Sequence, residues 1–144
     1  MDGLRYLLDT NILSALIRQP QGPVATMLAR RGYGTVCTSI VVAAELRFGA
    51  RKLGSSVLTR KVEDLLASLP VLPLEAGVDR TYAQIRLQLE RAGTPIGPND
   101  LLIAAHALDL DLTLVTDNVD EFTRVSRLRV ENWLDDPTPV PDSR

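Results

Sequence analysis

Short apolar runs alternate along this chain with longer stretches of helical periodicity, and this alternation constrains the fold more than any other feature. The apolar runs predict buried strands at 4–8, 35–38, 71–74, 112–116 and 128–131. Between them, apolar residues recur every three or four positions, as in Ile12, Leu13, Leu16 and Ile17, which is typical of an amphipathic helix. Strands that alternate with helices form mainly parallel sheets with helices on both faces. The sequence therefore predicts an α/β domain with a mainly parallel sheet.

Capping and breaking residues set the expected helix ends. Ser39 and Asn99 are predicted N-caps, and Gly54 and Gly93 are predicted to end helices. Pro73 indicates that its strand lies at an edge or ends there. The predicted helices are 10–17, 24–31, 40–53, 56–69, 76–92, 99–110 and 119–125.

Composition limits the classes of protein that the chain can belong to. A length of 144 residues predicts one domain, here 1–134, followed by a flexible proline-containing tail at 135–144. No apolar run is long enough to span a bilayer, and no signal peptide is expected. The single cysteine excludes an intramolecular disulfide. Together these features lead us to expect a cytoplasmic protein. A net charge of −2 argues against a general polyanion binder.

Four acidic residues fall where carboxylates can gather at one edge of the sheet. Asp9 and Asp117 each follow a predicted strand, and Glu45 and Asp100 lie in helical stretches that begin just after loops. The carboxyl ends of parallel strands form the ligand crevice of such a sheet. Carboxylates that converge there repel one another unless a cation lies between them, and an all-oxygen ligand set suits Mg²⁺ or Mn²⁺. The sequence thus points to metal-assisted phosphate chemistry.

Each acidic residue also has a simpler interpretation. Asp9 can cap the next helix, although Thr10 and Asn11 are equally good caps, which favours a ligand role for Asp9. Glu45 can pair with Arg47, although its neighbours are apolar. Asp100 can simply favour the dipole of a first helical turn.

The C-terminal acidic residues and the remaining reactive side chains have simple interpretations too. Asp117, between Thr116 and Asn118, can be an ordinary turn residue, and Glu121 a solvated helix start. His106, the only histidine, is expected to have a structural or surface role, and Cys37 to be a small core residue.

Two other functions are open to an α/β chain with acidic strand ends. A signalling receiver domain needs an Asp after a middle strand and a Lys near the last, but the strand ending at Thr38 lacks the first, and no lysine follows Lys61. A non-catalytic module that binds RNA or protein is the alternative that stays open. The cations Arg47 and Arg51 share a helix face and could guide a phosphate backbone, or could simply be solvated.

Four segments of the chain together resemble the PIN-domain ribonucleases, and among them the VapC-type toxins of bacterial toxin–antitoxin pairs. The resemblance runs from about Leu4 to Trp133. The segments are LLDTNILSAL, TSIVVAAELRFGARK, YAQIRLQLERAGTPIGPNDLLIAAHAL and LVTDNVDEFTRVSRLRVENW.

This resemblance implies a three-layer α/β/α sandwich with a five-stranded, mainly parallel sheet. It also implies a metal-dependent endoribonuclease that cleaves transfer, ribosomal or messenger RNA and so inhibits translation and growth. The partners implied are a VapB-type antitoxin that obstructs the acidic pocket and a second copy of the chain, as a homodimer within a toxin–antitoxin hetero-oligomer.

The resemblance also assigns site residues. Asp9, Glu45 and Asp100 match the three main acidic positions, which hold Mg²⁺ or Mn²⁺. Many family members place a fourth acid two residues after a threonine, where this chain has Asn118, while Asp117 is one residue after Thr116. We take Asp117 as the fourth catalytic and metal-binding candidate. The expected pocket support comes from Thr10, Asn11, Thr116 and Asn118.

Overall fold

The computed structural model describes residues 3–135 and alternates strands with helices, as the sequence predicts. The strands are β1 (Tyr6–Leu8), β2 (Val36–Ser39), β3 (Val71–Leu72), β4 (Thr113–Val115) and β5 (Val130–Glu131). The helices are α1 (Thr10–Arg18), α2 (Pro23–Arg31), α3 (Ile40–Leu53), α4 (Ser56–Ala67), α5 (Val78–Arg91), α6 (Pro98–Asp109) and α7 (Val119–Phe122), with a 3₁₀ turn, η1 (Tyr33–Thr35).

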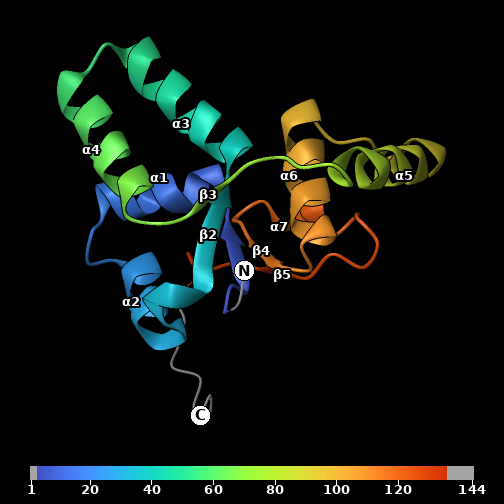
Figure 1. Cartoon of the computed structure of the whole chain (residues 1–144), viewed down its shortest axis with the longest axis horizontal. Coiled ribbons are helices and arrows are strands. Elements are labelled where there is room, and N and C mark those ends of the chain that lie inside the picture. Colours follow the sequence, from blue (N-terminus) through green and yellow to red (C-terminus); the bar gives the residue numbers. More distant parts are fainter. Residues whose placement is uncertain (1–2, 136–144) are drawn as a thin grey trace.

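The strands form one parallel sheet in the order β3-β2-β1-β4-β5. Helices α1 to α4 lie to the left of the strands in Figure 1, and α5 and α6 lie to the right. This arrangement confirms the three-layer α/β/α sandwich with a five-stranded parallel sheet. Because all strands are parallel, α1 and α3 begin at the carboxyl edge of the sheet, where β1 and β2 end.

The core surrounds the central strand β1. Leu7 and Leu8 are almost fully buried, and Leu114 is equally buried on the neighbouring strand β4. Strands covered by helices on both faces are apolar without alternation, and for this reason the sequence predicts these strands clearly. Burial of each such side chain contributes about 1.5–3 kcal/mol to folding.

Most helix ends agree with the capping residues, and one does not. Ser39 caps α3 by accepting a hydrogen bond from the Val41 amide at 3.1 Å, which confirms its predicted role. The prediction that Asn99 caps α6 is wrong, because the N-cap is Gly97 and the helix begins at Pro98. Proline is favoured at the first helical position, where its missing N–H is not needed, and this moves the start of the helix upstream.

The strand after α4 is short and lies at an edge, as its proline predicts. Strand β3 contains only Val71 and Leu72 and ends before Pro73, which has no N–H to donate.

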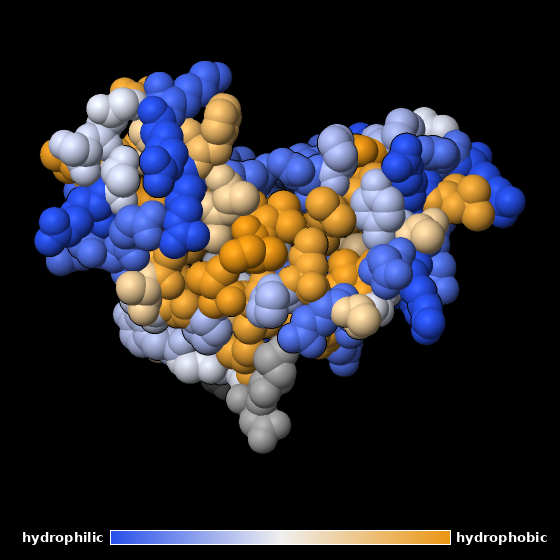
Figure 2. Space-filling model, turned by 45° about the horizontal axis from the view of Figure 1, so that its top comes forward, coloured by the Kyte–Doolittle hydropathy of each residue, from blue (hydrophilic) through white to orange (hydrophobic). Residues whose placement is uncertain are grey.

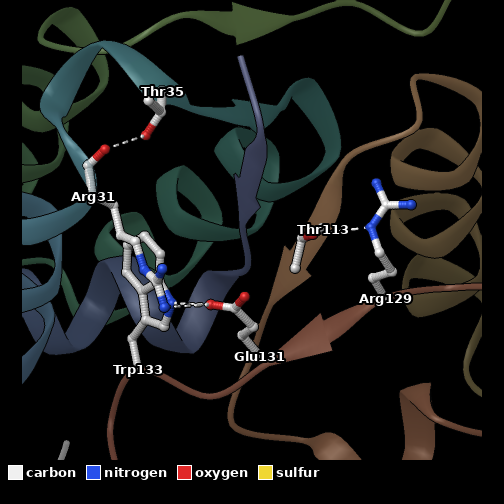
Figure 3. A network of polar contacts seen from close by, with 6 residues as sticks. All are labelled: Arg31, Thr35, Thr113, Arg129, Glu131 and Trp133. Carbon is white, nitrogen blue, oxygen red and sulfur yellow. Dashed lines mark hydrogen bonds and ion pairs between the residues drawn. The ribbon is translucent and has the colours of Figure 1, made fainter. Parts of the chain in front are cut away.

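Polar contacts attach the last strand to the end of α2 (Figure 3), and an aromatic contact attaches the segment after it to β1. The Trp133 indole donates to the Glu131 carboxylate at 2.9 Å, and Arg31 at the end of α2 lies 3.7 Å from the same carboxylate. The Trp133 ring meets Tyr6 of β1 edge to face, with centroids 5.1 Å apart. Because Trp133 is 1% exposed, these contacts make the C-terminal segment part of the core.

Apart from Asp135, the predicted C-terminal tail lies outside the described residues. Among the described helices, none combines the length and the apolar character needed to cross a bilayer.

Candidate functional site

Asp9 reaches the carboxyl edge of the sheet because β1 pairs in register with β4. Leu8 lies opposite Val115, so Asp9 follows its strand beside Thr116. The Thr116 hydroxyl donates to Asp9 Oδ2 at 2.7 Å, and the Thr10 amide donates to Oδ1 at 2.8 Å. Asp9 is therefore also the N-cap of α1, which confirms the simpler interpretation of this residue.

Glu45 lies in the second turn of α3 and accepts hydrogen bonds from two other helices. The Thr10 hydroxyl of α1 donates to Glu45 Oε1, and the Asn99 amide of α6 donates to Oε2 at 3.1 Å. Thr10 thus contacts both carboxylates, with its backbone on Asp9 and its side chain on Glu45. The predicted alternative for Glu45, a pair with Arg47, does not form, because Arg47 binds Glu63 of α4 at 2.8 and 2.9 Å.

Asp100 lies in the first turn of α6 and is hydrogen-bonded to Glu121 of α7. Burial, this neighbouring carboxylate and the charges of Asp9 and Glu45 together raise the pKa of Asp100 from 3.8 to about 8. Two carboxylates at hydrogen-bonding distance cannot both be ionised without a large cost, so Asp100 keeps its proton near neutral pH. We call Asp9, Glu45, Asp100 and Glu121 the acidic cluster.

The pKa of Asp9 is also raised by the negative charge around it. Burial raises its pKa, the hydrogen bonds from Thr116 and Thr10 oppose that rise, and the charges of Glu45 and Asp117 add to it. The pKa values of Asp9 and Asp100 thus both respond to charges on other elements, which places the residue that follows β1 and residues from α3, α6 and α7 in one site.

Glu121 is the acidic residue that sequence reasoning missed. It was expected to be a solvated helix start, but it is half-buried, contacts Asp100 and accepts a hydrogen bond from the Asn118 amide. The available signal was its place directly before Phe122, which is fully buried and fixes the orientation of the short helix α7.

Asp117 occupies the rim of the site. Its side chain is exposed and accepts a hydrogen bond from the Asn11 amide at 3.1 Å. Its charge contributes to the raised pKa of Asp9 and is not among the causes of the shift at Asp100. The role predicted for Asp117 as a metal ligand and that of Asn118 as pocket support stay predictions.

The histidine and the cysteine belong to the core. His106 Nδ1 lies 2.9 Å from the Ser39 hydroxyl, and its ring also hydrogen-bonds the backbone of Pro73. Burial lowers the pKa of His106, so it is neutral at physiological pH. Burial raises the pKa of the Cys37 thiol to about 12, which makes it a poor nucleophile. Both residues have the structural roles that were predicted.

The acidic cluster supplies only oxygen donors, and its spacing is open. Within residues 3–135, no three His, Cys, Asp or Glu side chains are arranged to hold one ion directly. Mg²⁺ commonly uses one or two carboxylates and keeps several of its waters. The donor types therefore fit a hydrated Mg²⁺ or Mn²⁺ ion better than a fully protein-ligated one.

The surface around this edge is hollowed between two projecting parts. Figure 2 turns the upper end of Figure 1 toward the reader and shows the α3–α4 hairpin on one side and α5 with α6 on the other. Hydrophilic residues cover both flanks, and hydrophobic residues gather between them. An extended polymer could reach the sheet edge through this hollow.

Comparison with known proteins identifies the family. The PIN domain model matches residues 6–128. Ribonuclease VapC2 of Rickettsia felis is 36% identical over 130 residues, which cover 89% of this chain and 97% of that protein. The tRNA(fMet)-specific endonuclease VapC of Shigella flexneri is 37% identical over 133 residues, which cover 90% and 98%.

Solved structures give the same result. The crystal structure of VapBC2 from Rickettsia felis, bound to a DNA fragment from its promoter, matches with a TM-score of 0.82 and 34% identity over 90% of this chain and 99% of that chain. DNA-bound VapBC from Salmonella typhimurium matches with a TM-score of 0.81 and 34% identity over 90% of this chain and 98% of that one.

Proposed function

Because this chain belongs to the PIN domain family and, within it, to the VapC ribonucleases, we propose that it is an RNA-cleaving toxin of a toxin–antitoxin pair. One observation carries the proposal: four carboxylates from four elements gather at the carboxyl edge of the sheet, where a binding site is expected. The names of the relatives, together with the retained Asp9, Glu45 and Asp100, favour this function over a non-catalytic binding module.

The substrate class follows from the relatives and the surface. Relatives in Shigella flexneri and Salmonella typhimurium are named tRNA(fMet)-specific endonucleases, so initiator transfer RNA is the first substrate to test. A folded RNA presents its single-stranded loops as the segments that proteins read most readily, and we propose that such a loop enters the hollow between α3 and α6.

We propose that the reaction depends on Mg²⁺ or Mn²⁺. The raised pKa of Asp100 supports this, because it reflects burial together with neighbouring negative charge, and a cation would relieve the second of these. Asp9 and Asp100 would hold the ion, with Glu121 or Glu45 beside it. When bound, the cation would make water nucleophilic at neutral pH and neutralise charge that develops on the phosphate.

The protein's own residues would orient the reaction. Asp9 is held in place by Thr10 and Thr116, and Glu45 is held by Thr10 and Asn99, so both carboxylates face the site in fixed orientations. No histidine base is required, since His106 is buried and bonded to Ser39. Asp117 with Asn11, and Asn118 with Glu121, would form the rim that the RNA approaches.

The partner proposed is a VapB-type antitoxin. Relatives of 34% identity were solved as VapBC complexes bound to DNA, and we propose that this chain likewise forms a toxin–antitoxin hetero-oligomer built on a homodimer. An antitoxin side chain of positive charge would enter the acidic cluster and compete with the cation. Because RNA and antitoxin are found in the cytoplasm, we place the protein there.

The test is RNA cleavage by antitoxin-free protein. The protein is incubated with initiator transfer RNA and with total RNA in Mg²⁺ or Mn²⁺, beside EDTA, Asp9→Asn, and the matched surface control Asp64→Asn on α4. Asparagine is also a good N-cap, so Asp9→Asn should leave α1 intact. We expect discrete fragments that disappear with EDTA and with Asp9→Asn and persist with Asp64→Asn. Absence of cleavage by the folded, metal-loaded wild type would favour the non-catalytic module.

A further inference from the structure

Glu45 has a donor on each of its carboxylate oxygens, and the two donors come from different helices. Thr10 at the start of α1 donates to Oε1, and Asn99 at the start of α6 donates to Oε2 at 3.1 Å. A glutamate side chain loses rotamer entropy when it is fixed, and two hydrogen bonds can offset this loss.

The start of α6 explains why Asn99 is free to make this contact. Gly97 is the N-cap and Pro98 the first helical residue, so Asn99 is the second residue of the helix and makes no cap hydrogen bond. Its amide instead reaches across to α3, 54 positions away in the sequence. Asn99 also precedes Asp100 directly, so one turn of α6 contacts Glu45 and supplies a member of the acidic cluster.

We propose that Asn99 is a positioning residue that fixes the Glu45 carboxylate toward the acidic cluster. The proposal rests on the nuclease function proposed above. The residue type is informative: an amide can donate to Glu45, whereas an aspartate at the same position could only add another negative charge. Glu45 is therefore pre-organised by Thr10 and Asn99, and Asn99 sets its distance from the helix that carries Asp100.

The first experiment separates positioning from RNA binding. Asn99→Leu keeps the approximate size and removes the donor, Asn99→Ala is the second variant, and Gln84→Leu on the exposed face of α5 is the matched amide control. Loss of a residue that orients a metal-site carboxylate lowers activity or metal affinity by about 10- to 100-fold. We expect kcat to fall by that factor for both Asn99 variants, with KM for RNA unchanged and Gln84→Leu equal to wild type.

The second experiment tests whether Asn99 acts through Glu45 and does not require catalysis. The Mn²⁺ affinity of wild type, Asn99→Leu, Glu45→Gln and the double variant is measured by titration calorimetry without RNA. We expect Asn99→Leu to weaken Mn²⁺ binding in the wild type and to add nothing in the Glu45→Gln background. Equal effects in both backgrounds, or no effect in either, would overturn the role of Asn99.

The two proposals fail in different ways. If the wild type binds Mn²⁺ but cuts no RNA, the nuclease function fails while the calorimetric cycle still decides the role of Asn99. If the wild type cuts RNA and the Asn99 variants match it in kcat and in Mn²⁺ affinity, only the positioning role is wrong. A wild type that binds no Mn²⁺ would overturn both.

Discussion

Replacing Asp100 by Asn should remove the activity and stabilise the metal-free protein at neutral pH. Asp100 is hydrogen-bonded to Glu121, and burial together with that carboxylate raises its pKa from 3.8 to about 8. Between these two values the folded protein keeps a proton that the unfolded chain releases. The stability of the wild type therefore falls as pH rises from about 4 to 8, because the folded state binds more protons than the unfolded state.

The size of the effect follows from the shift in pKa. Complete conversion at about 1.4 kcal/mol per pKa unit would give about 6 kcal/mol for the change from 3.8 to about 8. The side chain is only half-buried, and solvent screening reduces the contribution of such groups strongly, so we expect about 2 kcal/mol. That difference corresponds to a rise in melting temperature of about 5–10 °C for a domain of this size.

The assay is urea unfolding in EDTA at pH 4.5, 6 and 8, with Glu121→Gln as a second variant and Asp64→Asn as the surface control. The free energy of unfolding of Asp100→Asn should exceed that of the wild type by about 2 kcal/mol at pH 8. This gap in stability should close toward pH 4.5, where Asp100 is protonated or nearly so in both the folded and the unfolded state. Addition of Mg²⁺ should narrow the gap at pH 8, because the ion would stabilise only the wild type fully. A gap that is absent at pH 8, reversed in sign, or independent of pH would refute the account of the Asp100–Glu121 pair.

Three further predictions follow from the contacts. Thr116→Val removes the donor to buried Asp9 and should cost about 1–3 kcal/mol in urea unfolding, whereas Thr116→Ser should stay close to wild type. Leu114→Ala opens a cavity in the central sheet and should cost about 2–5 kcal/mol, measured in the same way. Mn²⁺ at a hundred times its dissociation constant should stabilise the wild type by about 2.7 kcal/mol, and calorimetric scans should show a clearly smaller rise for Asp9→Asn.

The sheet could be predicted because its strands are apolar on both faces. A run of apolar residues without alternation predicts a parallel strand covered by helices on both faces, whatever its neighbours are. The buried residues Leu7, Leu8 and Leu114 belong to such runs. The start of α6 was mispredicted because two local preferences compete over three residues. Asn99 is a good cap, but Pro98 fits the first helical position, and the structure follows the proline.

Strand register predicts the position of Asp9, whereas Glu45 and Asp100 lie in helices and were assigned to the site by the resemblance to the PIN family. Asp9 lies beside Thr116 because Leu8 pairs with Val115, and strand register carries that information. Glu121 lies in a helix of four residues, and the orientation of this helix depends on how the buried Phe122 packs. A helix this short has no apolar periodicity from which its orientation could be predicted. The sequence therefore pointed to Asp117, which lies at the rim.

The hydrogen bonds divide the acidic cluster into two unequal halves. Asp9 and Glu45 each receive two donors, so their charges are largely satisfied by the protein itself. Asp100 has Glu121 as its hydrogen-bond partner, Glu121 also accepts from Asn118, and the raised pKa of Asp100 shows that its ionisation is costly here. A cation bound at Asp100 would displace its proton and relieve that cost, while one bound at Asp9 would meet a carboxylate that is already oriented. The metal-free protein is therefore pre-organised on one side of the site and strained on the other, and it is the strained side that gains most from a bound cation.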